Sequence, residues 1–300
     1  ARAENAYLPG PPAADDKGPL IQALLAMKAL AESGVERTHT IRLLVGSEEE
    51  SSATEMPEYL ATHKPPDYSL VLDSEFPVVV GEKAWDGLGL VTSLTSRPGV
   101  EKPYTVQSID AGLSPSIVPD RAEAKLLWTR EGAADWIPVI AALEKFKMPE
   151  GTRLVVEPAG AQLRVVAYGK SAHSGVNLEG GRNALVALAK VLEGKLPTGG
   201  ANDLLAFARL AGKDLHGTGL GITDNDPIWG RYGVNVATVK PVESDPSKFM
   251  LYINLRRIPP RTGPQASRSR RNTIRSPGWC STSSLVAPSP CPPFASTARA

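Results

Sequence analysis

Apolar and polar residues alternate differently in two regions of the chain. In the first region, apolar residues recur at helical spacing from Leu20 to Glu32, which predicts an amphipathic helix. Two short apolar runs, Thr40–Val45 and Asp67–Leu72, have the length and composition of buried strands, and a short helix is expected between them at Thr54–Thr62. Residues 1–81 are therefore predicted to form an α/β domain.

The second region, residues 82–256, begins with a strand at Leu88–Thr95 and continues as strand, helix, strand, strand, helix, strand. The elements are Ala122–Arg130, Asp135–Lys147, Arg153–Val156, Gln162–Tyr168, Arg182–Leu192 and Phe249–Leu255. This order is that of the ferredoxin-like split βαβ motif, here interrupted by an insertion at Ala201–Asn235. A second, α+β domain is therefore predicted over residues 82–256.

Composition and charge set the last 44 residues apart. The whole chain has a net charge of +1, and residues 257–300 carry seven Arg and no Lys, Asp or Glu, which leaves −6 for residues 1–256. Their richness in Pro, Ser and Arg, without periodicity, predicts a disordered basic tail, and a nucleic-acid-binding arm is the less favoured interpretation. Both cysteines, Cys280 and Cys291, lie in this tail at a spacing typical of neither a metal site nor a redox motif.

The remaining composition indicates a globular protein without membrane or nucleic-acid partners. No apolar run reaches membrane-spanning length, and the N-terminus lacks an apolar signal segment, so a cytoplasmic location is expected. The glycines of Gly217–Gly221 lack the strand-to-helix setting of a nucleotide-binding loop. His39, His63 and His216 are interpreted as structural.

Carboxylates stand at the ends of three predicted elements: Asp15 and Asp16, the run Glu48–Glu50, and Asp73. Each has an ordinary explanation, because Asp caps helices and Glu is common in the first helical turn. However, carboxylates gathered at one edge of a sheet repel each other unless cations lie among them. A metal site at this edge is the alternative interpretation.

Four motifs resemble the di-zinc aminoacylase and dipeptidase family, which includes acetylornithine deacetylase, carboxypeptidase G and carnosinase, and most of all its bacterial dipeptidase branch. They are Asp15–Pro19, Gly46–Ser51, Asp73–Pro77 followed by Gly81–Lys83, and Gly169–Gly175 followed by Gly181–Ala184. Asn254–Arg257 is similar to the strand that closes the family's lid domain. The resemblance implies a zinc-exopeptidase-like α/β catalytic domain, incomplete here, with an inserted ferredoxin-like lid.

The resemblance also implies roles for individual residues. Asp15 would bridge two zinc ions, Glu50 and Asp73 would each bind one of them, and Mn or Co could replace zinc. Glu49 would be the general base that takes a proton from the metal-bound water. His173, from the lid of the same or a partner subunit, would stabilise the oxyanion. In the same way, Arg256 would hold the carboxylate of the substrate.

The sequence departs from the family pattern in its metal ligands. The family uses two further zinc-binding histidines, and none is found upstream of Asp15 or after Arg257. Ser116 also replaces an Asn that the family commonly places near the substrate. We therefore expect flanks that are truncated or translated out of frame. A donor set of carboxylates alone is better suited to Mg, Ca or Mn than to tightly held zinc, so weak zinc affinity and low activity are expected.

Two functions remain in competition. The first is a metal-dependent hydrolase of dipeptides or N-acyl amino acids, with a homodimer formed through the lid as its candidate assembly. The second is a catalytically impaired relative whose lid domain acts as an association module. A nucleic-acid binder using the basic tail ranks last.

Overall fold

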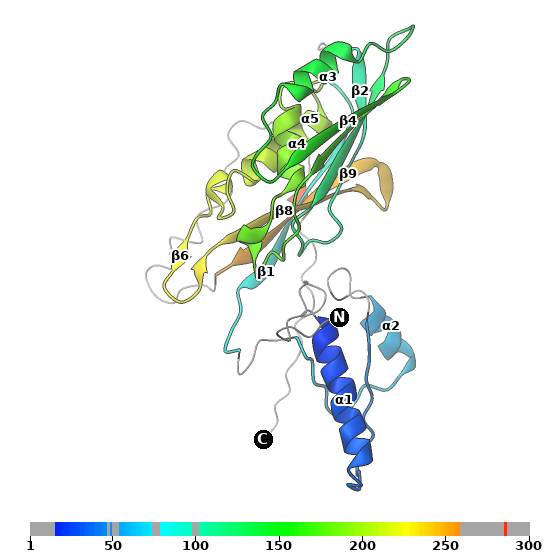
Figure 1. The fold of residues 1–300 in the computed structure, drawn as a ribbon, viewed down its shortest axis with the longest axis vertical. Coiled ribbons are helices and arrows are strands. Elements are labelled where there is room, and N and C mark those ends of the chain that lie inside the picture. Colours follow the sequence, from blue (N-terminus) through cyan, green and yellow to red (C-terminus); the bar gives the residue numbers. More distant parts are fainter. Residues whose placement is uncertain are drawn as a thin grey trace, which may run out of the picture. The chain divides into compact units, whose positions relative to one another are not determined.

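The fold is taken from a computed structural model of the whole chain. It describes residues 16–46, 49, 54–73, 79–97 and 102–258, together with the backbone of residues 285–286. The chain divides into two compact units, unit 1 (Ala1–Glu82) and unit 2 (Lys83–Ala300) (Figure 1). Each unit is described by itself.

Unit 1 contains both helices that the apolar spacing predicts. Helix α1 spans Gly18–Glu32 with Pro in its first turn, and α2 spans Glu55–Thr62. The residue before α1 is Lys17, which makes no side-chain cap, so helix capping by Asp16 is not observed. No helix among the described residues is long and apolar enough to cross a membrane.

The two strands predicted in unit 1 are not formed, and these two predictions are wrong. Neither Thr40–Val45 nor Asp67–Leu72 lies in a strand of the described structure. A strand needs a neighbour for its backbone N–H and C=O groups, and neither segment has a strand partner among the described residues. Their side chains stay in solvent: Val45, Leu70 and Val71 are 67%, 85% and 77% exposed.

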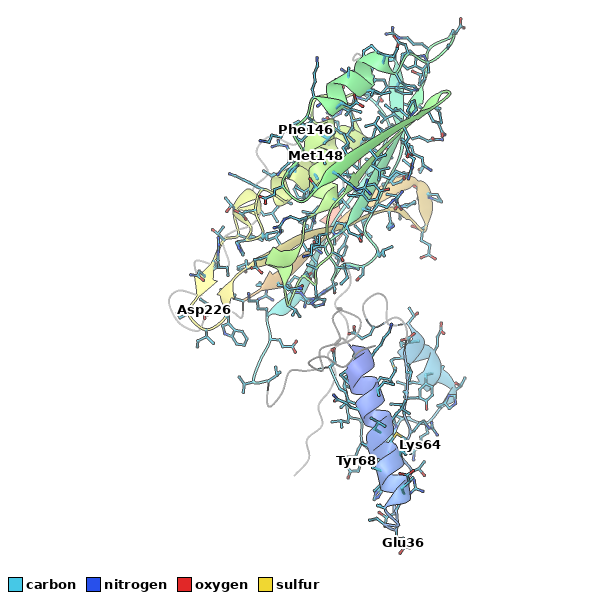
Figure 2. All side chains as sticks on the ribbon, viewed as in Figure 1. Glu36, Lys64, Tyr68, Phe146, Met148 and Asp226 are labelled. Carbon is cyan, nitrogen blue, oxygen red and sulfur yellow. The ribbon has the colours of Figure 1, made fainter. Side chains whose placement is uncertain are left out.

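The helices of unit 1 do not enclose a core either, since neither α1 nor α2 has a buried residue. Side chains project from this unit into solvent, as Tyr68 does with 86% of its surface exposed (Figure 2). The apolar side chains whose pattern predicts an α/β domain therefore remain largely exposed in the described part of unit 1.

Unit 2 is built on one antiparallel sheet with the strand order β10-β1-β9-β8-β2-β3-β5-β4 (Figure 1). The strands are β1 (Ala84–Ser93), β2 (Tyr104–Ala111), β3 (Arg121–Trp128), β4 (Arg153–Ala159), β5 (Gln162–Tyr168), β8 (Gly233–Val242), β9 (Asp245–Arg257) and β10 (Leu285–Val286). A separate short hairpin pairs β6 (Asn225–Asp226) with β7 (Gly230–Arg231). The helical elements are α3 (Ile137–Glu144), η2 (Leu178–Gly180), α4 (Ala184–Leu192), α5 (Gly200–Ala211) and η3 (Thr218–Leu220).

The sheet contains the predicted strands, but their hydrogen-bonded neighbours differ from those of the predicted split βαβ motif. The last strand of the predicted split βαβ motif forms within β9, yet β9 pairs with β1 and β8. The place beside β3 is taken by β2, a strand that the sequence pattern does not reveal. Because β2 directly precedes β3 in the chain, this hairpin-like pairing closes a shorter loop than a pairing of β3 with β9 would.

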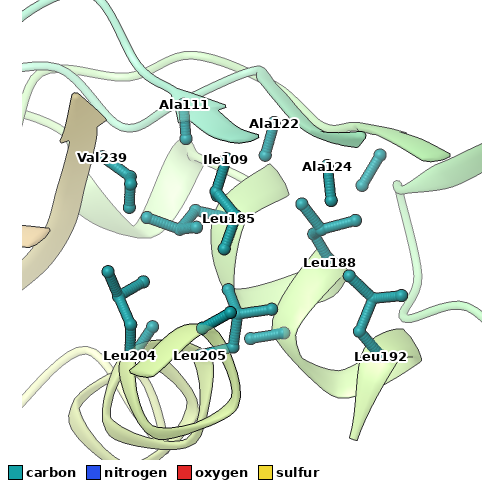
Figure 3. Packing of buried hydrophobic residues seen from close by; sticks show 14 of the residues in the cluster. Ile109, Ala111, Ala122, Ala124, Leu185, Leu188, Leu192, Leu204, Leu205 and Val239 are labelled. Carbon is teal, nitrogen blue, oxygen red and sulfur yellow. The ribbon is translucent and has the colours of Figure 1, made fainter. Parts of the chain in front are cut away.

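The core of unit 2 lies between the sheet and helices α4 and α5. Strand β3 alternates, so that Ala122, Ala124 and Leu126 face the helices while Arg121, Glu123 and Lys125 face away. Helix α4 places Leu185, Leu188 and Leu192 against this face, as seen in Figure 3. Phe146 and Met148, after α3, pack at the margin of the same core (Figure 2).

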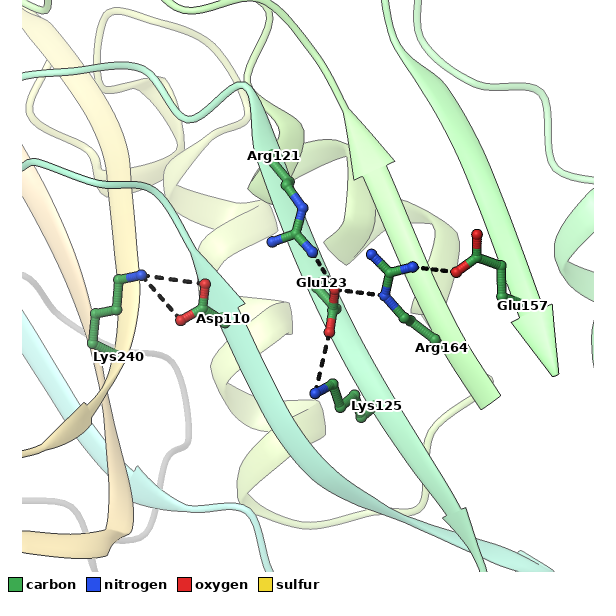
Figure 4. A network of polar contacts seen from close by, with 7 residues as sticks. All are labelled: Asp110, Arg121, Glu123, Lys125, Glu157, Arg164 and Lys240. Carbon is green, nitrogen blue, oxygen red and sulfur yellow. Dashed lines mark hydrogen bonds and ion pairs between the residues drawn. The ribbon is translucent and has the colours of Figure 1, made fainter. Parts of the chain in front are cut away.

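The opposite face of the sheet carries a network of charged side chains centred on Glu123 (Figure 4). Glu123 is 7% exposed and accepts hydrogen bonds from Arg121 and from Arg164 Nε, the latter at 2.8 Å, with Lys125 Nζ at 3.6 Å. Burial opposes ionisation of Glu123, but the Arg164 hydrogen bond and the three cationic charges outweigh it and lower its pKa.

We expect the amide hydrogens of α1 and α2 to exchange with solvent much faster than those of β3, β5, β8 and β9. The helices of unit 1 bury no residue, whereas these strands border a continuous core. Hydrogen–deuterium exchange followed by mass spectrometry on peptides of the intact chain measures the difference. Equal protection of Gly18–Glu32 and Arg121–Trp128 would contradict it.

We expect Glu123→Gln to lower the free energy of unfolding by about 1–3 kcal/mol at neutral pH, since it removes the carboxylate that three cations share. Because the pKa of Glu123 is lowered in the folded state, its contribution is complete above the ordinary value of 4.5. That contribution is lost as the pH falls through the folded-state pKa. The stability gap between wild type and variant should therefore close in acid.

Denaturant unfolding at a series of pH values provides the measurement. Asp110→Asn is the matched control, because Asp110 pairs with Lys240 at 3.0 Å on the same face but with a half-exposed side chain. Such a pair contributes about 0–1 kcal/mol. A gap for Glu123→Gln that is constant from neutral to acidic pH would contradict the prediction.

Candidate active site

The predicted acidic residues of unit 1 are only partly described. Asp15 and Glu50 lie outside the described residues, whereas Glu49 lies in a turn and Asp73 in a segment without regular secondary structure, both with exposed side chains. Among the described residues, no three His, Cys, Asp or Glu side chains come close enough to hold a metal ion. The convergence of these carboxylates therefore stays a prediction.

The donor chemistry of Asp15, Glu50 and Asp73 suits a divalent cation. Carboxylate oxygens bind Zn, Mn, Mg and Ca, but firmly held zinc generally has His or Cys among its ligands. Glu55 is a further carboxylate close to Gly46, the first residue of the Gly46–Ser51 motif, since a Cβ added to Gly46 would lie 2.1 Å from Glu55 Oε1. These residues thus fit a divalent metal in kind, with weaker retention of zinc than a histidine-containing site gives.

In unit 2, His173 lies on a segment that we call the His173 loop, residues 169–183, between β5 and α4. Its two ends are joined by Lys170 and Arg182, whose backbones exchange hydrogen bonds of 2.9 and 2.8 Å. The close approach requires Gly169, because a Cβ there would lie 1.8 Å from Arg182 O. The two ends of the loop are therefore held together by backbone hydrogen bonds alone.

The middle of the His173 loop is fixed by a second set of backbone hydrogen bonds. Val118 N donates to Ala172 O at 2.8 Å, and Ser174 N donates to Ser116 O at 2.7 Å. His173 lies between these two anchors, and its own N–H donates to Asn177 Oδ1 at 2.7 Å. The backbone position of His173 is thus set on both sides.

The His173 ring is also oriented by the backbone. The N–H of Gly175 donates to His173 Nδ1 at 3.3 Å, so Nδ1 is an acceptor and the neutral ring carries its proton on Nε2. A ring in this form presents an N–H donor at Nε2, which is what stabilisation of a developing oxyanion requires.

Arg256, at the end of β9, lies next to His173. A Cβ added to Gly175 would be 3.2 Å from Arg256 Cζ and 3.4 Å from His173 Cε1, so both side chains border the same point. Arg256 Nε donates to Ser174 Oγ at 3.2 Å. The structure thus brings together the two predicted site residues of unit 2.

Beneath Arg256 lies a polar residue whose importance the sequence reasoning missed. Asn254 is fully buried, with 0% exposure, and its Oδ1 accepts a hydrogen bond of 2.8 Å from Ser174 Oγ. Asn235 on β8 pairs with Asn254 across the sheet and is 1% exposed. An asparagine inside an apolar strand, as in Tyr252–Leu255, is the signal that could have revealed it.

Comparison with known proteins gives a family and several relatives. Residues 2–249 match the family described as "Peptidase family M20/M25/M40". "Putative dipeptidase SH1171" of Staphylococcus haemolyticus is 34% identical over 121 residues, which are 40% of this chain and 26% of that protein. "Putative dipeptidase" of Staphylococcus epidermidis is 28% identical over 226 residues, 75% of this chain and 47% of that protein. "Putative dipeptidase SAB1611c" of Staphylococcus aureus gives the same identity and coverage. The chain spans about half, or less, of the length of these relatives.

We expect His173 and His216 to show opposite neutral tautomers. His216 Nδ1 lies 2.8 Å from the carbonyl oxygen of Tyr232, which can only accept, so His216 carries its proton on Nδ1. His173 accepts at Nδ1 and should carry its proton on Nε2. Nitrogen-15 chemical shifts of the two rings at alkaline pH distinguish the forms, and a proton on Nδ1 of His173 would overturn the assignment.

Proposed function

Because this chain belongs to the M20/M25/M40 peptidase family, we propose that it is a metal-dependent hydrolase of dipeptides. The names of the staphylococcal relatives, which describe them as putative dipeptidases, support this substrate class over longer peptides. The single observation that carries the proposal is the shared position of His173 and Arg256 around Gly175.

The close approach of these two side chains supports a short substrate such as a dipeptide. The scissile carbonyl and the terminal carboxylate of a dipeptide are separated by one residue, and consecutive Cα atoms are about 3.8 Å apart. Two donor groups that border one point can therefore contact both ends of that residue. Arg256 would bind the carboxylate, because a guanidinium forms paired, charge-assisted hydrogen bonds with it.

His173 would act on the carbonyl. Its Nε2–H is aligned by the Gly175 N–H at Nδ1, and it would donate to the oxygen on which negative charge develops. A donor held in place by the backbone needs no rearrangement when that charge appears, so the whole hydrogen bond is available to the transition state.

The acidic residues of unit 1 would supply the metal site and the base. Asp15, Glu50 and Asp73 would hold two zinc ions, or Mn or Co, which activate water at neutral pH and polarise a carbonyl when bound. The Glu49 carboxylate would accept the proton released by the attacking water and later deliver it to the leaving amine. A carboxylate can do both because one proton on its oxygen links the two steps.

The substrate class and the association of the chain each have an alternative. An N-acyl amino acid has the same separation of carbonyl and carboxylate as a dipeptide, so it remains the alternative substrate. Association through residues 82–256, as a homodimer or as an inactive module, remains a prediction, and the dipeptidase relatives favour the hydrolase.

We expect the intact chain, with Zn, Co or Mn added, to release amino acids from dipeptides such as Ala-Ala. Glu49→Gln should lower kcat by about 10²–10⁴-fold, since an amide accepts no proton at neutral pH. Quantitation of free amino acid over time measures this. The same assay on N-acetyl-alanine ranks the two substrate classes.

Glu36→Gln is the matched control for Glu49→Gln, because Glu36 is an exposed glutamate of the same unit that has no proposed role. It should leave kcat unchanged. Hydrolysis by Glu49→Gln at the wild-type rate would refute Glu49 as the base. No hydrolysis of either substrate by the wild-type chain with any of the three metals would refute the proposed activity of this chain.

A further inference from the structure

Asn254 is a buried amide at a position where the neighbouring residues of β9 are apolar. Leu251 and Ile253 enter the core, while Tyr252, Asn254 and Arg256 share the other face of the strand by alternation. The Asn254 amide is satisfied at both ends: Oδ1 accepts from Ser174 Oγ at 2.8 Å, and Nδ2 donates to Asp86 O at 3.4 Å. Leaving such a group unpaired costs about 1–3 kcal/mol, so its surroundings are built for it.

The direction of these hydrogen bonds is determined step by step. Asp86 O is a carbonyl and can only accept, so the Asn254 NH₂ points toward it and Oδ1 points toward Ser174. The Ser174 hydroxyl has one proton, which it donates to Asn254 Oδ1. Its lone pairs are then left to accept from Arg256 Nε at 3.2 Å.

We propose that Ser174 and Asn254 are positioning residues that hold the Arg256 guanidinium in the orientation that receives the substrate carboxylate. The inference rests on the proposed role of Arg256 in carboxylate binding. The hydrogen bond from Arg256 Nε to Ser174 Oγ at 3.2 Å restricts rotation of the guanidinium, and the orientation of that planar group decides whether it can form paired hydrogen bonds with a carboxylate. Preorganisation of this kind lowers the entropy lost on binding.

The backbone supports allow this role to be separated from folding. Ser174 is held by its own N–H to Ser116 O, a bond that does not involve the hydroxyl. Asn254 is flanked by β1 and β8, where Gly87 and Asn235 are its register partners. Removing the Ser174 hydroxyl should therefore remove the hydrogen bond to Arg256 Nε without releasing the loop.

Asn235 supports the same device from the neighbouring strand. Its Nδ2 donates to Pro115 O at 3.1 Å and to Ile117 O at 2.9 Å, on either side of Ser116. Two buried asparagines that face each other across β8 and β9 thus hold the two segments around Ser174. Asn235 fixes the backbone that anchors Ser174, and Asn254 fixes its hydroxyl.

The test uses the full chain and nuclear magnetic resonance of the Arg256 Nε–Hε group, assigned by its loss in Arg256→Lys. The probes are Ala-Ala and Ala-Ala amide, which lacks the carboxylate. In wild type, Ala-Ala should shift this resonance and bind more tightly than the amide. In Ser174→Ala, the affinity for Ala-Ala should fall about tenfold, which is the effect of weakening one charge-assisted hydrogen bond. The affinity for the amide should stay unchanged, because the amide has no carboxylate to bind Arg256.

Three variants complete the design. Ser174→Thr keeps the hydroxyl and should restore most of the affinity for Ala-Ala. Asn254→Ala should weaken Ala-Ala binding as Ser174→Ala does, because the Ser174 proton loses its acceptor. Ser247→Ala, at the other end of β9, removes a hydroxyl that donates a hydrogen bond of 2.6 Å to Asp245 Oδ1 and should change neither affinity.

The outcomes distinguish the positioning role of Ser174 and Asn254 from carboxylate binding by Arg256. If Ser174→Ala binds Ala-Ala as tightly as wild type, with an unchanged Arg256 Nε–Hε signal, the positioning role is overturned while carboxylate binding by Arg256 stands. If wild type does not distinguish Ala-Ala from its amide, the proposed role of Arg256 fails and the positioning role fails with it. A fall in affinity for both probes alike would indicate loss of the fold and would also count against positioning.

Discussion

Helix α4 buries nearly its whole length against the sheet of unit 2, and the rest of that unit depends on this contact. Leu185, Leu188 and Leu192 belong to the core that this contact forms, together with residues of the sheet and of α5 (Figure 3). Truncating one buried leucine costs about 2–5 kcal/mol, whereas loss of the Glu123 carboxylate is expected to cost about 1–3 kcal/mol and an exposed ion pair contributes about 0–1 kcal/mol. Burial of the apolar face, to which many side chains contribute, therefore stabilises the unit more than the charges on the opposite face do. The His173 loop ends at the N-terminus of α4 and shares its rigidity.

The candidate site of unit 2 combines a rigid backbone with a buried polar group. Backbone hydrogen bonds fix the loop around His173, and the Gly175 N–H orients its ring. Arg256 is longer and needs side-chain support, which Ser174 and Asn254 supply. The buried amide stabilises little by itself, so its place beneath a proposed substrate-binding arginine is best understood as geometric control.

Unit 1 shows what happens to the same kind of pattern without a covering surface. Its segments carry strand-like apolar runs, and α1 has the predicted helical spacing, yet α1 and α2 bury no residue. Leu70 and Val71 remain exposed because no partner strand or helix covers them among the described residues. An apolar pattern states which residues should be buried, but only a second surface can bury them.

By itself, the sequence determined the local elements and the family. Spacing at 3.6 or 2 residues located α1, α3, α4, β3 and β5, since this periodicity is set within a single segment. The ordered motifs identified the peptidase family and the candidate residues Glu49, His173 and Arg256. Tertiary structure decided the strand order, with β2 rather than β9 beside β3, and it gives Thr40–Val45 no strand partner among the residues that it describes. It also decided that Asn254 lies under Arg256. Pairing and burial depend on residues far apart in the chain, and no local pattern contains them.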